Sequence, residues 1–425
     1  MNALRRLKSD ATLPLLADGY RWLPAQWERT TAPVVRTRLL GRPAVALRGP
    51  DAVRFFYEEP RIARSDALPE PVLSTLFGHG AVHTLDGRAH QVRKTLFVDL
   101  LKDPGRIDAL AESAGAIWDE TAGWWADGRR VVLFDEVSRI LTRAVCGWAG
   151  LPLDAARVEP VARDLVAMVD GFAAVGPRHV RARRARNRAE KGLMRLIAQI
   201  RTGERKVPDG SVVDLVVHHR DADDKLIDAH TAAVELLNVI RPTVAVCWYV
   251  AFAAHALHQD PDQRQKMLDE DGYARAFTHE VRRYYPFAPF VAGVANEELF
   301  HQGEPIEEGS LVLLDLYGQN HDEELWPQPY DFDPGRFVNR PPQRDVLVPQ
   351  GGGEAASGHR CPGEDITVRL LEVLTLRLAR LAYAVPTQDL RIDLGRMPTR
   401  PRSGFVLTRS SDSPSASTAA PSQEG

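Results

Sequence analysis

The spacing of apolar residues predicts a mainly helical chain with a few short strands. In several segments apolar side chains recur every three or four residues, which is the pattern of a helix with one buried face. Alternating apolar and polar residues predict strands on both sides of 41–43, between 288 and 317, and up to Leu407. The predicted helices are as follows: from Asp51, from near Gly87, over 103–150 with a turn at Gly128, over 154–201 with a break at Gly176 and Pro177, and from Pro362 to about Ala382.

The longest helical pattern covers residues 226 to about 258 and contains the most apolar part of the chain. At 1.5 Å per residue such a helix is about 45 Å long and can cross the whole molecule. Pro242 lies in its middle and removes one hydrogen bond of the helical ladder, which predicts a kink. The apolar run 243–257 is interrupted only by His255 and is short for a membrane span, so we expect a buried core helix and no stable membrane insertion.

Composition and charge limit the partners and the cellular compartment that we expect for this protein. Its 425 residues carry a formal net charge of −3, which argues against nucleic acid as a partner. Its three cysteines (Cys146, Cys247 and Cys361) lie far apart and give no disulfide framework, as is typical of the reducing cytoplasm. The first 22 residues contain no apolar segment long enough for a signal peptide or an anchor. We therefore expect a cytoplasmic protein.

Two segments have an unusual composition. The end of the chain, SSDSPSASTAAPSQEG, is of low complexity, and 410–425 is predicted to be a disordered tail. The second helix of 154–201 contains RHVRARRARNRAEKGLMRLIAQIR, whose arginines are too dense for all of them to be buried. They predict either a solvated helix face or a basic surface that attracts an anionic substrate or partner.

Candidate chemistry is concentrated in a glycine-rich loop with one cysteine, LVPQGGGEAASGHRCPGEDIT (347–367). The glycines allow the backbone to pass close to a flat, bulky group. Cys361 precedes a predicted helix N-terminus, where unpaired amides stabilise a thiolate, so we expect a lowered pKa for this thiol. A single thiolate suits a one-cysteine metal centre better than a zinc site. Taken alone, the loop is equally compatible with an ordinary buried cysteine.

Two further motifs decide between these interpretations. THEVRRYYP (278–286) places Glu280 and Arg283 one helical turn apart, and DFDPGRF (331–337) supplies Arg336. In this order, and followed by the cysteine loop, the motifs resemble those of the cytochrome P450 family. In that family the three charged residues form a structural ion-pair network under the haem, and the resemblance implies the same role here.

The resemblance extends over roughly residues 45 to 405 and implies a fold and a cofactor. The fold is a single cytochrome P450-like haem domain over 1–409, mainly α with small β-sheets. The cofactor is haem b, held between the long central helix and the helix after the cysteine, with Cys361 as the axial ligand of the iron. Haem contacts carried over from the family fall on the following residues: His90, Arg64, Lys94 and His359.

A second site lies in the long helix, which reads NVIRPTVAV around Arg241 and Pro242. Ordinary members of the family place an acidic residue in this helix, and here the acid is missing. An arginine in so apolar a helix is costly to bury unless an anion pairs with it, and a substrate carboxylate is the natural candidate. The Arg-Pro pair resembles the fatty-acid peroxygenases of the family. GHRCPGE and LFGHGAVHTLDGRAH agree with that subgroup, as does the presence of Glu354 where most other members have Phe.

The subgroup implies an activity. The carboxylate of a long-chain fatty acid binds Arg241 and supplies the acid–base function that the enzyme lacks, while hydrogen peroxide is the oxidant and no redox partner is required. Oxidation at the α and β carbons gives hydroxy acids and, by oxidative decarboxylation, terminal alkenes. His83 aligns with a position that is His in members linked to decarboxylation and Gln in hydroxylating members. A His there has a pKa in a useful range, although it could equally pack above the haem.

Other functions and roles stay open at this point. The same fold could serve an oxygen-dependent monooxygenase that needs redox partners, or a haem protein without turnover. Three aromatic residues flanked by apolar ones are candidate walls of an acyl-chain pocket, or ordinary core: Phe77, Phe287 and Phe290.

Overall fold

The computed structural model describes residues 10–58 and 60–410, so that, apart from Ser410, the predicted tail 410–425 lies outside the described residues. The helices are α1 (Thr12–Asp18), α2 (Trp22–Trp27), α3 (Pro50–Phe56), α4 (Glu70–Val72), α5 (Gly87–Leu101), α6 (Pro104–Gly123), α7 (Leu133–Ala149), α8 (Ala155–Asp170), α9 (Pro177–Arg201), α10 (Val212–Val217), α11 (Ala229–Gln259), α12 (Asp262–Asp269), α13 (Tyr273–Tyr284), α14 (Leu316–Asn320) and α15 (Glu364–Arg380). Short 3-10 helices lie at η2 (Gly19–Arg21), η4 (Val82–Thr84) and η5 (Pro334–Phe337), and one π-helical turn lies at η3 (Leu73–Phe77).

The strands form three small sheets. The strands are β1 (Val35–Leu39), β2 (Arg42–Leu47), β3 (Ile62–Ala63), β4 (Arg130–Val132), β5 (Phe290–Ala295), β6 (Leu299–His301), β7 (Glu304–Ile306), β8 (Leu311–Asp315), β9 (Tyr383–Ala384) and β10 (Val406–Arg409). The largest sheet has five strands in the order β1-β2-β8-β5-β3, in which β2 and β8 are parallel and the other neighbours are antiparallel. The predicted hairpin at 41–43 and the predicted strands of 288–317 are confirmed.

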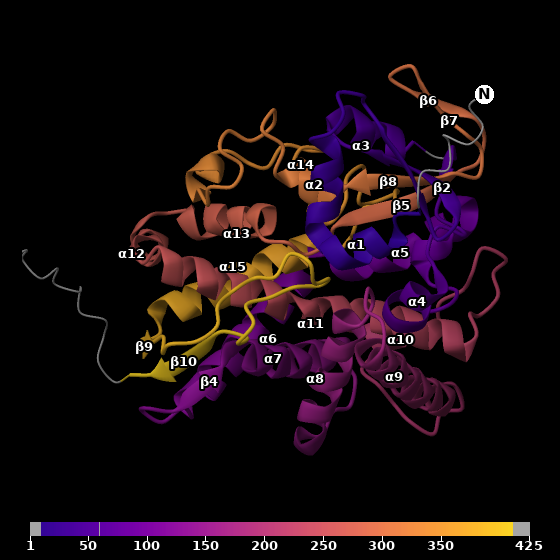
Figure 1. The fold of residues 1–425 in the computed structure, drawn as a ribbon. Coiled ribbons are helices and arrows are strands. Elements are labelled where there is room, and N and C mark those ends of the chain that lie inside the picture. The colour runs from indigo at the N-terminus through magenta and orange to yellow at the C-terminus, as the bar shows by residue number, and fades with distance from the viewer. Residues whose placement is uncertain (1–9, 59, 411–425) are drawn as a thin grey trace, which may run out of the picture.

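The helix α11 organises the helical part of the molecule. It packs against α7, α8, α9 and α15, and its N-terminus is capped by Asp228, whose carboxylate accepts hydrogen bonds from the N–H groups of His230 and Thr231 (Figure 1). Within the described residues it is the one helix long and apolar enough to cross a membrane, but 94% of its most apolar window is buried inside the fold. The prediction of a buried core helix is confirmed.

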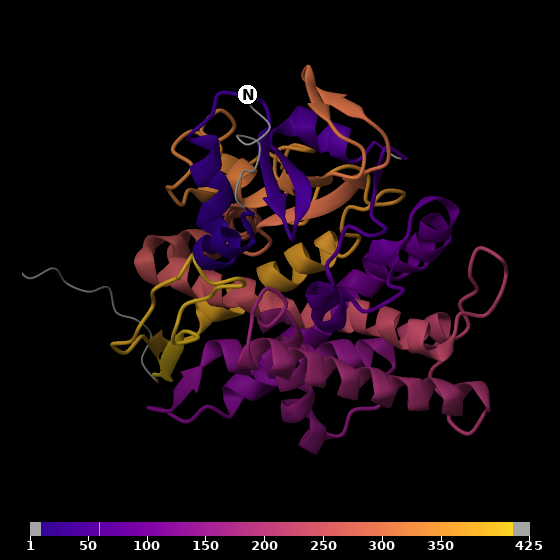
Figure 2. The same ribbon diagram turned by 45° about the vertical axis from the view of Figure 1, so that its right-hand side comes forward.

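The molecule has two regions, seen in both views (Figures 1 and 2). The largest sheet lies on one side with α1, α2 and α3, and the long helices α7, α8, α9 and α11 lie on the other. The helices α5 and α15 run between these two regions. The glycine-rich cysteine loop leads directly into α15, so the fold brings this loop close to the middle of the molecule.

Candidate functional site

A cavity of about 900 Å³ lies between α11, α5, the cysteine loop and the largest sheet. This volume is at the upper end of the range for ligand pockets in proteins. The cavity collects residues that are far apart in the sequence. All of those predicted to contact haem or substrate line it: Arg64, Phe77, His83, His90, Lys94, Arg241, Pro242, Phe287, Phe290, His359 and Cys361.

The sulfur of Cys361 forms part of one wall. Gln350 Nε2 donates a hydrogen bond to it over 3.6 Å, and the backbone N–H of Cys361 donates to the carbonyl of Gln350. Burial raises the pKa of this thiol, although the Gly363 amide, Lys94 and Gln350 act in the opposite direction. The predicted lowering is therefore wrong, because α15 begins only at Glu364 and desolvation outweighs the nearby amides. A metal that binds a thiol deprotonates it, so the ligand role does not depend on the pKa of the free thiol.

The glycines before the cysteine are required by close packing. Gly351 and Gly353 both have positive φ angles, of 90° and 72°. A Cβ on Gly351 would lie 2.5 Å from the hydroxyl oxygen of Tyr57, and one on Gly353 would lie 2.8 Å from its ring. The loop thus lies directly on the Tyr57 side chain. Glu354, in the position where most of the family has Phe, forms an ion pair with Arg344 at the surface.

Cationic and imidazole groups surround the same part of the cavity. Lys94 is buried and its Nζ donates to the carbonyl of Arg360 over 2.6 Å. Arg64 is buried and donates to the carbonyls of Ile62 and Phe56. The rings of His90 and His359 are stacked, with centroids 3.7 Å apart. Burial lowers the pKa of His90 to about 4, so this ring is neutral near pH 7.

These residues fit a haem. Cys361 offers one sulfur ligand, and the buried Nδ1 atom of His90 has no hydrogen-bond partner among the described residues. Buried polar atoms are nearly always hydrogen-bonded, so His90 is suited to a polar group of a bound molecule. Lys94 and Arg64 add positive charge that matches carboxylate groups on the rim of a porphyrin. All four residues predicted to contact haem line the cavity, and their role in binding it stays a prediction.

The predicted ion-pair network is present. Arg283 donates two hydrogen bonds of 2.7 Å to the carboxylate of Glu280, and both side chains are completely buried. Arg336 lies 3.6 Å from the same carboxylate, which also accepts the N–H of Asp333. Arg283 donates in addition to the carbonyls of Asn320 and Pro329. The network therefore ties α13 to the irregular chain that leads into the cysteine loop.

A second buried ion pair beside it was not predicted. Arg282 lies in the last turn of α13 and pairs with Glu364, the first residue of α15. It also donates to the side chain of Gln350 over 3.2 Å, and Gln350 in turn donates to Cys361. The motif THEVRRYYP contains this arginine next to Arg283, but only the fold shows that the two serve different partners. Arg282 thus fixes the amide that contacts the sulfur.

Arg241 lies in the part of the cavity that α11 lines. Its side chain is buried, with 5% of the residue exposed, and its Nη2 makes one long hydrogen bond of 3.4 Å to the side-chain oxygen of Asn238. Its Nε has no hydrogen-bond partner, and no ion pair to Arg241 is present in 10–58 or 60–410. Burial and the charge of Arg186 lower its pKa to about 9, which still leaves the guanidinium charged at pH 7.

Asn238 connects Arg241 to a buried ion pair that sequence reasoning missed. The amide nitrogen of Asn238 donates to the carbonyl of Phe77 over 3.0 Å and to Glu235 Oε2 over 3.2 Å. Glu235 Oε1 accepts from Arg93 over 2.8 Å and from the N–H of Val82 over 2.8 Å. We call these residues (Arg93, Glu235, Asn238 and Arg241) the polar chain.

Part of the polar chain can be recognised in the sequence as polar residues within an apolar helix. Glu235 and Asn238 are the polar residues in an otherwise apolar stretch of α11, about two turns and about one turn before Arg241, respectively. Glu235 is the nearest carboxylate to Arg241 along α11, yet it is engaged by Arg93 and Val82. Burial raises the pKa of Glu235, and the Arg93 charge opposes that rise. The helix thus supplies no free carboxylate next to Arg241.

His83 and Phe77 line the cavity beside Arg241. Their rings are 4.4 Å apart, and the Arg241 guanidinium lies 5.8 Å from the Phe77 ring. Burial and the charge of Arg241 lower the pKa of His83 to about 3. The prediction of a pKa in the useful range is therefore wrong, because a buried imidazole beside a cation does not take up a proton. His83 is neutral at pH 7, and its Nδ1 has no hydrogen-bond partner among the described residues.

Phe287 and Phe290 complete the apolar part of the wall. Phe287 packs against Tyr249 with ring centroids 4.8 Å apart, and its carbonyl accepts a hydrogen bond from the hydroxyl of Tyr20. Phe290 begins β5, and both rings are partly exposed to the cavity. Together with Phe77 they make an apolar surface that ends at a guanidinium, a shape suited to an acyl chain with a carboxylate at one end.

Comparisons with known proteins agree with this geometry. Residues 254–388 match the family model described as Cytochrome P450. A variant of cytochrome P450SP alpha (CYP152B1) is 41% identical, with a TM-score of 0.91, and the match covers 94% of this chain and 98% of that one. A variant of cytochrome P450 OleT, solved in complex with arachidonic acid, is 35% identical with a TM-score of 0.90 and coverages of 94% and 96%.

More distant relatives match only in part. Putative cytochrome P450 137 of Mycobacterium tuberculosis is 28% identical over 202 residues, which is 46% of this chain and 42% of the relative. Human cytochrome P450 4A11 is 24% identical over 219 residues, 48% of this chain and 40% of the relative. The match thus spans about two fifths of the length of these curated relatives.

One explanation accounts for three findings: structural matches over 94% of the chain, a cavity of about 900 Å³ lined by one cysteine, and the Glu280–Arg283–Arg336 network. The sequence resemblance is confirmed, as is the mainly helical fold with small sheets. The chain belongs to the cytochrome P450 family, and its structural neighbours include the CYP152 enzymes.

Proposed function

We propose that this protein is a haem-thiolate peroxygenase that uses hydrogen peroxide to oxidise long-chain fatty acids at the α and β carbons. Family membership implies a haem bound through a cysteine thiolate, and Cys361 is the cysteine of the cavity. Arg241 carries the proposal: it is a buried cation in an apolar cavity, with no carboxylate partner among the described residues. A buried charge without a counter-ion is unfavourable, and a fatty-acid carboxylate would remove that cost.

Two structural neighbours support this choice of substrate. A variant of OleT is described in complex with arachidonic acid, and P450SP alpha in complex with (R)-ibuprofen. Both ligands are carboxylic acids, which share one anionic group at the end of an apolar body. The cavity described here offers the matching arrangement, with Arg241 next to apolar walls that include Phe77 and Phe287.

The proposed mechanism assigns separate tasks to the chain and the substrate. Haem held by Cys361 would supply the chemistry by which peroxide oxidises a C–H bond. Arg241 holds the substrate carboxylate through its planar guanidinium. The bound carboxylate accepts a proton from hydrogen peroxide and returns it, a general acid–base role. The chain itself offers no such carboxylate on α11, because Glu235 is held by Arg93 and Val82.

The position of the carboxylate also determines where oxidation occurs. Because Arg241 fixes the carboxylate end of the fatty acid, the α and β carbons of the fatty acid are the ones held near the reacting group. In hydroxylation, one C–H bond becomes C–OH while hydrogen peroxide is reduced to one water. In decarboxylation a C–H bond at the β carbon and the bond between the α carbon and the carboxyl group both break, and a double bond forms between the α and β carbons. Hydrogen peroxide and the acid then give a terminal alkene, carbon dioxide and two waters. His83, which is neutral at pH 7, lies beside the site proposed for the fatty-acid carboxylate. Contact between His83 and that carboxylate would shift the balance between hydroxylation and decarboxylation.

Product analysis tests the proposal. Haem-loaded protein receives a saturated long-chain fatty acid and hydrogen peroxide, without a reductase or a nicotinamide. We expect α- or β-hydroxy acids, and terminal alkene if decarboxylation also occurs. The variant H83Q should lower the ratio of alkene to hydroxy acid. If protein with a normal thiolate-haem spectrum gives no product, the proposal is contradicted and an oxygen-dependent monooxygenase is favoured. If the protein also gives no product when a reductase is supplied, it is a haem-binding protein without turnover.

Variants of Arg241 test the role of the guanidinium. R241M removes the charge and keeps much of the volume, so we expect the dissociation constant of the fatty acid to rise by about 30-fold or more. R241K serves as the matched control, because it keeps the positive charge but cannot donate two parallel hydrogen bonds to a carboxylate. We expect an intermediate loss of affinity for the fatty acid. Unchanged peroxide-driven oxidation by R241M would refute the carboxylate anchor. We also propose that the protein acts in the cytoplasm, because its three cysteines lie far apart in the sequence and give no disulfide framework.

A further inference from the structure

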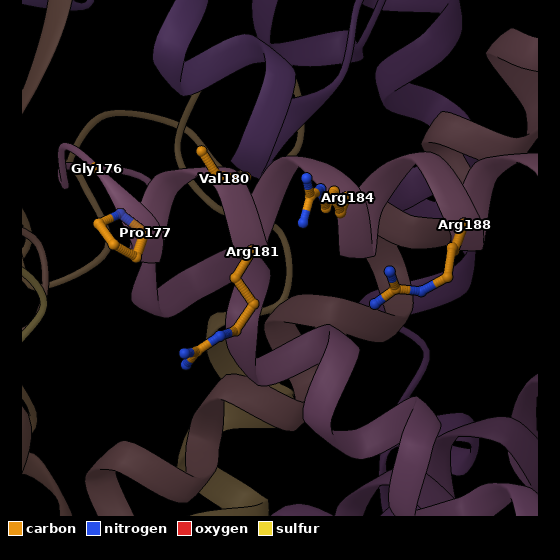
Figure 3. A pocket seen from close by; sticks show the side chains of 6 residues that line it. All are labelled: Gly176, Pro177, Val180, Arg181, Arg184 and Arg188. Carbon is orange, nitrogen blue, oxygen red and sulfur yellow. The ribbon is translucent and has the colours of Figure 1, made fainter.

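The helix α9 presents a row of cations along one face. Counting along the helix, the spacing of three and four residues places five side chains on the same side, over about 21 Å. These residues are Arg181, Arg184, Arg188, Lys191 and Arg195, all exposed, and we call them the basic stripe. Figure 3 shows the first three on α9, beside an open groove of about 620 Å³ that Gly176, Pro177 and Val180 also line.

The charge of the basic stripe is largely unneutralised. Only Arg188 has an ion-pair partner in the described part of the chain, Asp164 of α8 at 2.6 Å. Glu190 is the one acidic residue of α9, and it is taken by the buried Arg186 at 2.6 Å and by His230 at 3.5 Å. The whole chain has a net charge of −3, so this positive face is a local feature and would orient the molecule toward a negative surface.

Apolar side chains and the cavity meet at the N-terminal end of the stripe. Val175 is 76% exposed and Val180 is 44% exposed, which is unusual for valine. Val175 and Gly176 also line the large cavity, and Gly176 lines the groove as well. The basic stripe therefore leads to the rim of the cavity, where Val175 lies, and Val180 lies in the groove beside it.

We propose that the basic stripe docks this protein on an anionic lipid bilayer, with the cavity rim turned to the lipid surface. A helix with four to eight cations on one face and apolar residues beside them is suited to that surface. The alternative partner is an acidic carrier protein that holds an acyl chain as a thioester. A thioester has no free carboxylate for Arg241, whereas a free fatty acid resides in a bilayer. The preference for a lipid bilayer over a carrier protein rests on the proposed function. The cationic surface itself is independent of the proposed function.

Co-sedimentation with vesicles tests the docking. Holoenzyme is mixed with vesicles of phosphatidylcholine alone, or of phosphatidylcholine with phosphatidylglycerol, and pelleted. We expect binding only to the anionic vesicles, and its loss at high salt. The triple variant R181Q/R184Q/K191Q should bind about a hundredfold more weakly, at about fivefold per cation. The matched control R129Q/R340Q/R380Q removes three exposed charges outside α9 and should bind like the native protein.

Three results would overturn the proposal. One is the absence of the native protein from pellets of anionic vesicles. Another is equal binding by the stripe variant and the control variant. The third is retention of the protein on an immobilised acidic acyl-carrier protein, together with no vesicle binding, which would assign the stripe to a protein partner.

A turnover experiment separates this proposal from the proposed function. With a short, freely dissolved fatty acid and peroxide, the stripe variant should react as fast as the native protein, because its changes lie outside the cavity. With a long-chain acid embedded in anionic vesicles, it should react at least tenfold more slowly. If the native protein oxidises neither the short nor the long fatty acid, the proposed peroxygenase function is contradicted, and the vesicle-binding result is unaffected.

Discussion

The variant E235Q tests whether the polar chain holds the site together. Glu235 is completely buried, and its carboxylate accepts hydrogen bonds from Arg93, Val82 and Asn238. Glutamine keeps the volume but removes the charge, so that Arg93 stays buried without its counter-ion. Its amide nitrogen would also meet the amide nitrogen of Asn238, and two donors cannot bond to each other. We therefore expect a loss of stability together with a change at Arg241.

The size of both effects follows from the contacts. Breaking a buried ion pair by removing one partner costs about 3–5 kcal/mol of unfolding free energy. If Asn238 turns away, Arg241 loses its 3.4 Å contact to Asn238 Oδ1, the one side-chain acceptor that it has among the described residues. A hydrogen bond to a charged group contributes about 1.5 kcal/mol, which corresponds to roughly a tenfold increase in the Kd of the fatty acid. The double variant R93M/E235Q removes both charges of the Arg93–Glu235 pair and should recover most of the stability.

Two measurements check these values. Urea unfolding of haem-loaded protein, at a fixed concentration of free haem, gives the change in unfolding free energy for each single variant and for the double variant. Spectral titration with a fatty acid gives Kd. If the double variant loses as much stability as the sum of the two single variants, the two charges do not interact as described. If E235Q leaves Kd unchanged, the polar chain does not orient Arg241.

Two further predictions concern stability. E280Q should cost about 3–5 kcal/mol and speed haem loss, because Arg283 is completely buried and would lose its counter-ion; unchanged Soret decay and urea midpoint would contradict this. Burial lowers the pKa of His255 to about 4, so its folded form is neutral while the unfolded chain takes up a proton below pH 6.5. Stability should therefore fall by up to about 3 kcal/mol from pH 6.5 to 4, and H255Q, which can still bond Tyr285, should flatten that slope in urea midpoints measured across pH.

Features that depend on local patterns were predicted from the sequence. The apolar run that forms α11 and the helical spacing of Glu280 and Arg283 are examples, and the structure contains both. Periodicity places side chains on one face of a helix whatever the rest of the fold does. The short helices α1 and α2 were not predicted, because their few residues carry too little periodicity to stand out.

The tertiary structure decided which groups meet and how they ionise. The sequence by itself determined the family motifs, the cysteine, and an arginine in an apolar helix. It did not show that Arg93 of α5 reaches Glu235 of α11, since that contact joins residues 142 positions apart. It also led to the wrong direction for the pKa of Cys361 and the wrong range for that of His83. Both depend on desolvation, and the extent of burial exists only once the whole chain has packed around the cavity.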